Sequence, residues 1–225
     1  MNNSVTGQLI WKDWQLNKKT VILSIFGGGI ALAIICMGGT TPFLLGSIWF
    51  FVALIMLASI LPGTVILNER KKQTLAFVMS LPISSVQYGV SKLASTVGVF
   101  LAPWLTLLAA GFWIIKVRHA LPLGVIPIAL ILAVLPLIGF CLISGAALIG
   151  ETEGWYTGAV AAVNSSYWFV WYTLMMRFPD LNRNWLSVTA VWSPNVLTIL
   201  AGELTLVALI LGVTLFIQSR KRDFV

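Results

Sequence analysis

Long stretches without charge constrain this chain more strongly than any other feature of its sequence. A helix needs about 20 mostly apolar residues to cross the ~30 Å hydrocarbon core of a bilayer. Six segments approach or exceed that length, and almost all of the charged residues lie between them. We expect membrane spans at residues 20–37, 43–67, 93–115, 125–149, 155–176 and about 197–217.

Composition excludes an ordinary soluble enzyme. Of the 225 residues, 59% are hydrophobic and 9% are charged, whereas a soluble domain usually carries about 25% charged residues. Backbone groups in lipid must be satisfied internally, so spans are helices or strands of a closed barrel. Barrel strands alternate apolar and polar residues, and none of the six segments does so. The sequence therefore predicts an all-α, polytopic membrane protein in which residues 1–225 form one transmembrane domain.

Basic residues set the expected orientation, because the cytoplasmic flanks of membrane helices carry an excess of Lys and Arg. With both termini in the cytoplasm, ten basic residues lie on the inner side and four on the outer side. We therefore expect a multi-pass protein of the cytoplasmic membrane. Its net charge of +7 favours contact with anionic lipid and gives no reason to expect a nucleic-acid partner. The inner residues are Lys12, Lys18, Lys19, Arg70, Lys71, Lys72, Lys92, Arg220, Lys221 and Arg222, and the outer ones are Lys116, Arg118, Arg177 and Arg183.

Two tryptophans mark the segment before the first span. Trp11 and Trp14 lie beside Lys12 and Asp13 within residues 6–17, and Trp side chains favour the headgroup layer of a membrane. We expect this segment to form an interfacial helix along the inner leaflet. A simple anchor at the membrane edge is the alternative.

The longest inner loop, residues 68–91, differs in composition from the rest of the chain. It opens with the charged run 69–72, continues through mostly apolar residues, and contains Pro82, which ends any helix that runs up to it. A mixed polar and apolar helix at this surface can dock into a groove of a partner protein. The alternative is that the loop only joins two spans. The candidate anchors are Phe77, Met79, Val86 and Tyr88.

Polar and aromatic residues gather in the fifth and sixth spans. The group in the fifth span is either a surface that faces a substrate or a belt at the membrane interface. A carboxylate within a span is a functional candidate by default, although Glu203 lies near the expected outer boundary. The candidate path residues are Asn164, Tyr167, Trp168, Trp171, Tyr172 and Glu203.

Motifs for nucleotide binding, metal binding and catalysis are missing from the sequence. The run of glycines at 27–29 is not followed by the Lys and Ser or Thr of a phosphate-binding loop. Two isolated Cys and one His make no zinc pattern. Ser144 is far in sequence from His119, which we expect in an outer loop. We therefore expect no enzyme activity, no metal and no cofactor bound by this chain.

With the inner loop in view, the chain resembles the permease subunits of type 2 ABC exporters. The resemblance is carried by Glu-Arg-Lys-Lys-Gln-Thr-Leu at 69–75, Ser-Leu-Pro-Ile-Ser at 80–84, and Lys92 at the start of the third span. Gln73 stands where that family usually has Gly. Weaker matches are Lys12-Asp13 in the Trp-rich segment, Ser193-Pro194 before the last span, and the ending 220–224.

The resemblance implies a transport machine with several subunits. Two permeases, identical or different, would form one pathway above two copies of a cytoplasmic ATPase, which would bind ATP and Mg²⁺. The substrate would be amphipathic, a peptide or lipid-like, with a peptide antibiotic as one example. The loop after the second span would carry the ATPase motion through Glu69, Arg70, Thr74, Leu75, Phe77, Met79, Leu81, Pro82, Val86 and Tyr88.

Two other classes of function stay open at this stage. An ion-coupled secondary transporter or channel would need ionisable residues within the spans, and Glu203 is the only acidic one there. A membrane-bound immunity or sensor protein would bind its ligand without transporting it.

Overall fold

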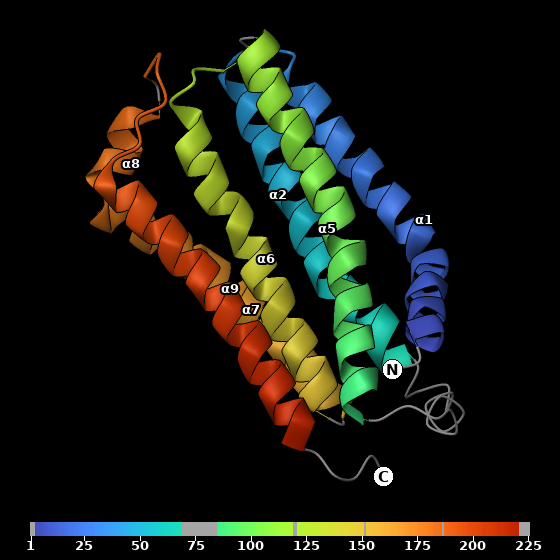
Figure 1. Ribbon diagram of the computed structural model, residues 1–225. Helices are drawn as coiled ribbons and strands as arrows, with labels where there is room; N and C mark the ends of the chain where they lie inside the picture. The colour runs from blue at the N-terminus through green and yellow to red at the C-terminus, as the bar shows by residue number, and fades with distance from the viewer. Residues whose placement is uncertain (1–2, 69–84, 119–120, 151, 186, 221–225) are drawn as a thin grey trace.

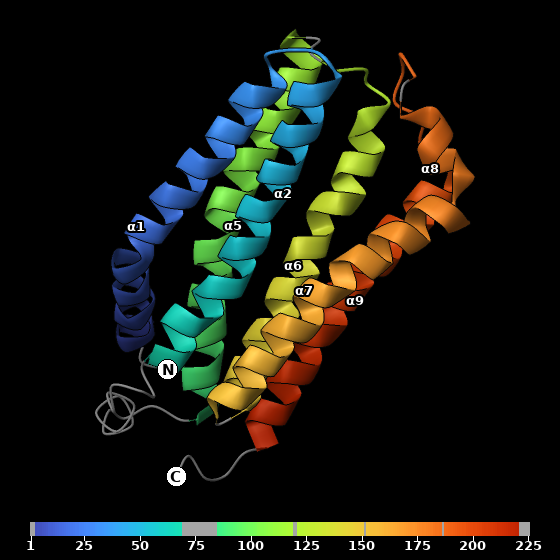
Figure 2. The same cartoon turned by 180° about the vertical axis from the view of Figure 1, so that it is seen from behind.

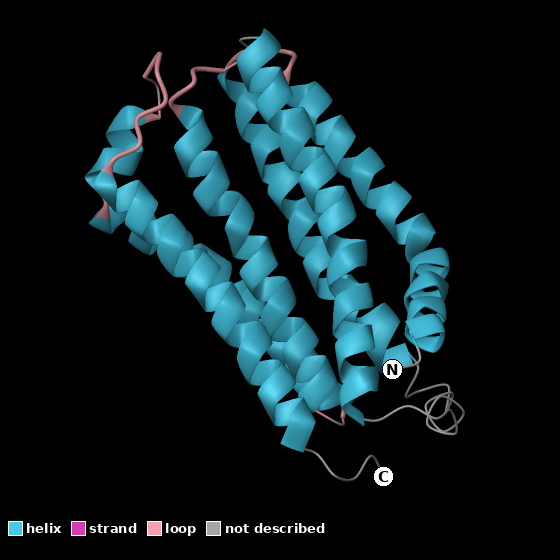
Figure 3. Cartoon of the chain, viewed as in Figure 1, coloured by secondary structure: helices cyan, strands magenta, loops and turns pink. Residues whose placement is uncertain are grey.

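All of the regular structure described for this chain is helical. The computed structural model describes residues 3–68, 85–118, 121–150, 152–185 and 187–220, and these contain seven α-helices, one π-helical turn and no strand (Figures 1 and 3). The predicted all-α class is confirmed. The elements are α1 (Asn3–Ile35), α2 (Thr40–Pro62), the π-helix η1 (Gly63–Leu67), α5 (Ser85–Arg118), α6 (Val125–Ile149), α7 (Glu153–Arg177), α8 (Pro179–Asn184) and α9 (Pro194–Arg220).

Five helices are long and apolar enough to cross a membrane. They are Ile10–Ile35, Thr40–Leu67, Tyr88–Val117, Val125–Ile149 and Pro194–Arg220. The bounds of α6 match the predicted span, and the second, third and last spans have bounds within about five residues of the predicted ones. The first span begins at Ile10, ten residues before the predicted start at residue 20. Residues 155–176, expected as a further span, do form helix α7, but α7 is not among the five because its sequence is more polar. The structure therefore defines a polytopic membrane protein with five candidate spans.

Helix α1 replaces the two helices expected at residues 6–17 and 20–37. It runs without a break from Asn3 to Ile35, because the junction Asn17-Lys18-Lys19 contains neither Gly nor Pro to end a helix. The side-chain amide of Asn17 also donates a hydrogen bond of 2.9 Å to the carbonyl oxygen of Asp13, one turn earlier. The segment expected at the membrane surface is thus the first part of a packed helix, and Trp14 contacts the main apolar core.

Helix α5 begins earlier than the third predicted span. It starts at Ser85, three residues after Pro82, so residues 85–91 belong to the helix rather than to the inner loop. Nothing between Ser85 and Lys92 except Gly89 disfavours a helix.

The helices form two groups that lie side by side. Helices α1, α2 and α5 make one group, and α6, α7 and α9 make the other (Figures 1 and 2). The main core joins the two groups and includes the stacked rings of Phe100 and Phe140, whose centroids are 4.2 Å apart. Helix α1 begins and α9 ends at one end of the bundle, which we call the inner end, and α8 lies at the opposite, outer end (Figure 1).

Helices α1 and α2 approach closely at Gly46. A Cβ added there would lie 2.6 Å from the side chain of Ile35 and 2.8 Å from the carbonyl oxygen of Ala31. Backbone cannot yield to a methyl group as a flexible side chain can, so Gly is required at this contact.

We predict that Gly46→Ala lowers the free energy of unfolding by about 1–3 kcal/mol through overpacking. The measurement is thermal or denaturant unfolding of the purified protein in detergent. Gly27→Ala is the matched control, because a Cβ at this helical glycine meets no atom within 4 Å and gains helix propensity. Equal stability of the two variants would contradict the close approach of α1 and α2.

Candidate functional site

A buried ion pair joins α1 to α5 at the inner end of the bundle. The Nζ atom of Lys92 lies 2.9 Å from Oδ1 and 2.8 Å from Oδ2 of Asp13. Only 1% of Lys92 and 3% of Asp13 is exposed. Two charges can be buried so deeply only when they are paired and when their remaining polar atoms find hydrogen bonds.

Neighbouring polar groups supply those hydrogen bonds. The Ser95 hydroxyl donates to Oδ2 of Asp13 at 2.8 Å, and Lys92 donates to the carbonyl oxygen of Val65 at 3.5 Å. The Thr64 hydroxyl donates to Oδ1 of Asn17 at 3.0 Å, and Asn17 in turn donates to the backbone of Asp13. The network therefore ties together three elements, α1, η1 and α5. We call it the inner polar network: Asp13, Asn17, Thr64, Lys92 and Ser95.

The inner polar network lies at both ends of the loop that the sequence singled out. Thr64 is in η1, the last turn before that loop, and Lys92 is in the second turn of α5, which follows it. The π-helical turn itself matters here, because such turns occur often at functional sites. Both ends of the loop are thus linked to α1, through hydrogen bonds on one side and an ion pair on the other.

Most of the predicted docking residues belong to the segment 69–84. Residues 69–84 lie outside the described part of the chain, and they include Glu69, Arg70, Thr74, Leu75, Phe77, Met79, Leu81 and Pro82. Val86 falls in the first turn of α5. Tyr88 needs a correction, because only 2% of it is exposed. It packs inside the bundle and is not a surface anchor for a partner.

The candidate path residues divide into two sets. Asn164, Trp168 and Tyr172 are exposed on α7, with 75% of Trp168 accessible, and Trp171 is partly buried. Glu203 is buried on α9. The structure therefore does not bring all six residues into one surface.

Tyr167 is partly buried, and the oxygen of its hydroxyl is shielded from solvent. Its hydroxyl lies against Gly139 of α6 and has no hydrogen-bond partner among the described residues. On the same helix, Tyr156 donates a 2.6 Å hydrogen bond to the carbonyl oxygen of Ser59, and Ser59 donates to Asn164 at 3.4 Å. These bonds hold α7 against α2, although Val163 is the one residue of α7 that is fully buried.

At the outer end, the segment after α7 folds back over the start of α6. The backbone N–H of Gly124 donates to the carbonyl oxygen of Ser187 at 3.0 Å, and the ring of Trp185 stacks on Phe43 with centroids 6.0 Å apart. Asn195 donates to Asp180 at 2.9 Å. Ser193 caps α9, since its hydroxyl accepts the N–H of Val196 at 3.4 Å.

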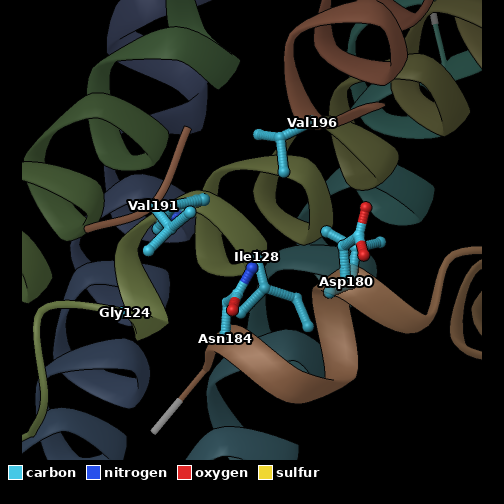
Figure 4. Close-up of a pocket in the computed structure, with 8 residues that line it drawn as sticks. Gly124, Ile128, Asp180, Asn184, Val191 and Val196 are labelled. Atoms are coloured by element: carbon cyan, nitrogen blue, oxygen red, sulfur yellow. The ribbon is translucent and has the colours of Figure 1, made fainter. Parts of the chain in front are cut away.

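A small pocket lies beneath this outer segment. Asp180 and Asn184 of α8 border it together with Ile128 of α6, Val196 of α9 and Val191 (Figure 4). Its cavity volume of about 10 Å³ holds one water molecule at most. This pocket is too small to receive a transported substrate.

No combination of metal ligands is present in the described part of the chain, where no group of three His, Cys, Asp or Glu residues comes together. Cys36 is exposed and Cys141 is buried, and both are free thiols.

Comparisons with known protein families, with curated proteins and with solved structures find no match to this chain. The inner polar network is therefore the best-defined polar feature on which a functional argument can be based.

Sequence reasoning missed this network because it used Lys92 as a basic flank and as part of the family resemblance, and Asp13 as part of the Trp-rich segment, without pairing the two residues. A signal was present, however. Ser91, Lys92, Ser95 and Thr96 form a polar stripe at helical spacing on an otherwise apolar helix, and Asp13 and Asn17 are one turn apart. Facing polar stripes on two apolar helices indicate a contact between them.

We predict that Lys92→Met destabilises the protein by about 3–5 kcal/mol, because it removes the buried counter-charge of Asp13 and leaves that carboxylate only the partly exposed Lys12, whose Nζ atom lies 4.0 Å from Oδ1. Unfolding in detergent measures the loss. Lys19→Met is the matched control, since it removes an equal charge from an exposed position on α1 and should change stability by less than about 0.5 kcal/mol.

The double variant Asp13→Asn with Lys92→Met should recover part of that loss, because neither side then carries an unpaired charge. If the stability lost in the double variant equals the sum of the losses in Asp13→Asn and Lys92→Met alone, the two residues do not interact.

Proposed function

We propose that this chain is the permease subunit of an ATP-driven exporter of the type 2 ABC class. Two permeases, either two copies of this chain or this chain and a second one, form the pathway. Two cytoplasmic ATPase subunits bind ATP and Mg²⁺ and work on the loop after α2. The inner polar network is the observation that carries the proposal.

An energy-transducing loop must be connected to the helices that it moves. Asp13 bonds to both Lys92 and Ser95 on the helix that follows the loop. It is also connected through Asn17 to Thr64 on the turn that precedes the loop. A partner that displaces the loop therefore acts on α1, α2 and α5 at once. Shifting such an equilibrium from 1:99 to 99:1 takes about 5.5 kcal/mol of differential binding, which a nucleotide-binding partner can supply.

Helix α7 supports the requirement for a second permease. Its 25 residues span about 37 Å, enough to cross the bilayer, and we assign it as the sixth span. Its exposed surface includes Asn164 and Ser165, which are unfavourable against lipid but suit a protein interface or a pathway. The hydroxyls of Thr157 and Ser166 bond to carbonyl oxygens of α7 itself. A second permease beside α7 covers this surface.

The same surface fits an amphipathic substrate. The Oδ1 atom of Asn164 accepts a hydrogen bond from Ser59, so its side-chain NH₂ group is what it offers to a substrate, and Trp168 and Tyr172 offer aromatic rings with polar edges. Together they match a peptide or a lipid-like molecule better than a small inorganic ion. The pathway in the proposed dimer therefore lies along α7.

We predict that α7 crosses the membrane and that residue 152 lies in the cytoplasm. After both native cysteines are replaced, Val188→Cys should react with a membrane-impermeant maleimide in intact cells, because Val188 is exposed at the outer end. Thr152→Cys, which is also exposed, should react only after permeabilisation. Labelling of both positions from the same side would exclude α7 as a span.

We further predict that Phe77→Asp weakens binding of the ATPase at least about tenfold, or 1.4 kcal/mol, while the protein still inserts. The measurement is copurification from cells that co-express the chain with ABC ATPase subunits of the same genome. Val188→Asp is the matched control, because it places the same charge on an exposed apolar residue at the outer end. Unchanged binding in the Phe77 variant would refute the assigned docking loop.

A further inference from the structure

Glu203 is a buried acid with no partner in the part of the chain that the structure describes. Only 9% of the residue is exposed, and Oε2 of its carboxyl group makes no hydrogen bond there. It lies on the face of α9 that also buries Val196, Thr214 and Gln218. Its burial therefore results from packing of α9 against its neighbours.

Helix α6 is the element that covers this face. Val196 packs with Ile131 near the start of both helices, and a Cβ at Gly145 would lie 2.7 Å from the Thr214 hydroxyl nearer their ends. The two helices thus run in the same direction. Glu203 lies two turns, about 10 Å, after Val196, which places it at the level of Pro136 on α6.

Among the residues that the structure describes, no basic residue accompanies Glu203 at that level. Helix α6 carries no charged residue, and its one titratable side chain is Cys141. On α7 the charged residues are at the two ends, Glu153 and Arg177. The titratable groups between them are Tyr156, Tyr167 and Tyr172.

The other neighbours of α9 supply no counter-charge either. Helix α5 meets α9 where Gly89 faces Gln218, far from Glu203, and its Lys92 is already bound to Asp13. Lys116 and Arg118 lie at the end of α5 away from that contact. On α8, Asp180 is bonded to Asn195 and Arg183 is exposed. An ionised carboxylate at position 203 would therefore be buried without compensation, which costs far more than carrying a proton.

We propose that Glu203 is an intramembrane proton-binding site. Its carboxyl group carries a proton while α9 is packed against α6. When that packing opens to water, the O–H bond breaks, the proton passes to water, and the carboxylate remains. This inference does not depend on the proposed ATPase or on a second permease.

The surroundings offer hydrogen-bond acceptors for the proton. Pro136 has no N–H, so the carbonyl oxygen of Leu132 loses its usual helical donor. The adjacent carbonyl of Ala133 accepts a 2.9 Å hydrogen bond from Nε1 of Trp104, on the α5 side of α6. The Tyr167 hydroxyl, also without a partner among the described residues, lies beside Gly139, within about one turn of that level. A neutral carboxyl group fits this polar but uncharged setting.

Dicyclohexylcarbodiimide tests the proposal, since it reacts with proton-bearing carboxyl groups in apolar surroundings. We expect mass spectrometry of the purified chain in detergent to locate the adduct on Glu203. Labelling should be strongest in acidic buffer and should fall about tenfold for each pH unit once the group ionises. Asp13 is the internal control, because its ion-paired carboxylate should stay unmodified. An adduct on Asp13 but not on Glu203, or equal labelling of Glu203 in acidic and alkaline buffer, would overturn the proposal.

Thermal unfolding across the same pH range gives a second readout. Glu203→Gln mimics the neutral carboxyl group, so we expect wild-type stability in acidic buffer and a smaller loss than wild type toward alkaline pH. Glu153→Gln is the matched control, because Glu153 is exposed at the start of α7 and should leave the pH profile unchanged. A loss of stability in Glu203→Gln at every pH would mean that the carboxylate is paired, which would refute a proton-binding role.

Discussion

The ion pair between Asp13 and Lys92 is the interaction on which the inner end of the bundle depends. Neither residue could be buried alone, because an unpaired charge in this setting costs several kcal/mol. Their pairing fixes the depth of α1 against α5, and the hydrogen bonds from Ser95 and Thr64 extend that constraint to η1. The two described segments that flank residues 69–84, η1 and the start of α5, are thereby both linked to α1.

The two groups of helices differ in whether their buried polar atoms have hydrogen-bond partners. Those of the inner polar network, on α1, η1 and α5, are bonded to one another. Buried polar atoms without partners among the described residues all lie on α6, α7 and α9, at Ser144, Tyr167, Glu203 and Gln218. Unsatisfied groups disfavour the arrangement that buries them. Opening the packing of the second group would therefore cost less hydrogen bonding than breaking the network of the first.

The positions of the spans could be predicted from composition, whereas the contacts between side chains on different helices could not. Run length and lack of charge located α6 to the residue, and Ser193-Pro194 marked the start of α9. The continuity of α1 could not be read from its tryptophans, because interfacial preference does not determine whether a helix ends. Tyr88 was misplaced because a polar-edged aromatic fits a surface or a core equally well. The carboxylate of Glu203 stood out as an intramembrane charge, but its lack of a partner depends on how α9 packs.

Helix α7 buries little of its surface against the rest of the chain, since Val163 is the only buried residue along its length. Such a helix has little intrinsic stability inside a single subunit and gains most from whatever covers its polar side. Under the proposed assembly, the chain on its own would expose this polar surface and would be a substrate for membrane quality control, which degrades unassembled subunits. Its abundance would then follow the supply of the proposed second permease rather than its own rate of synthesis.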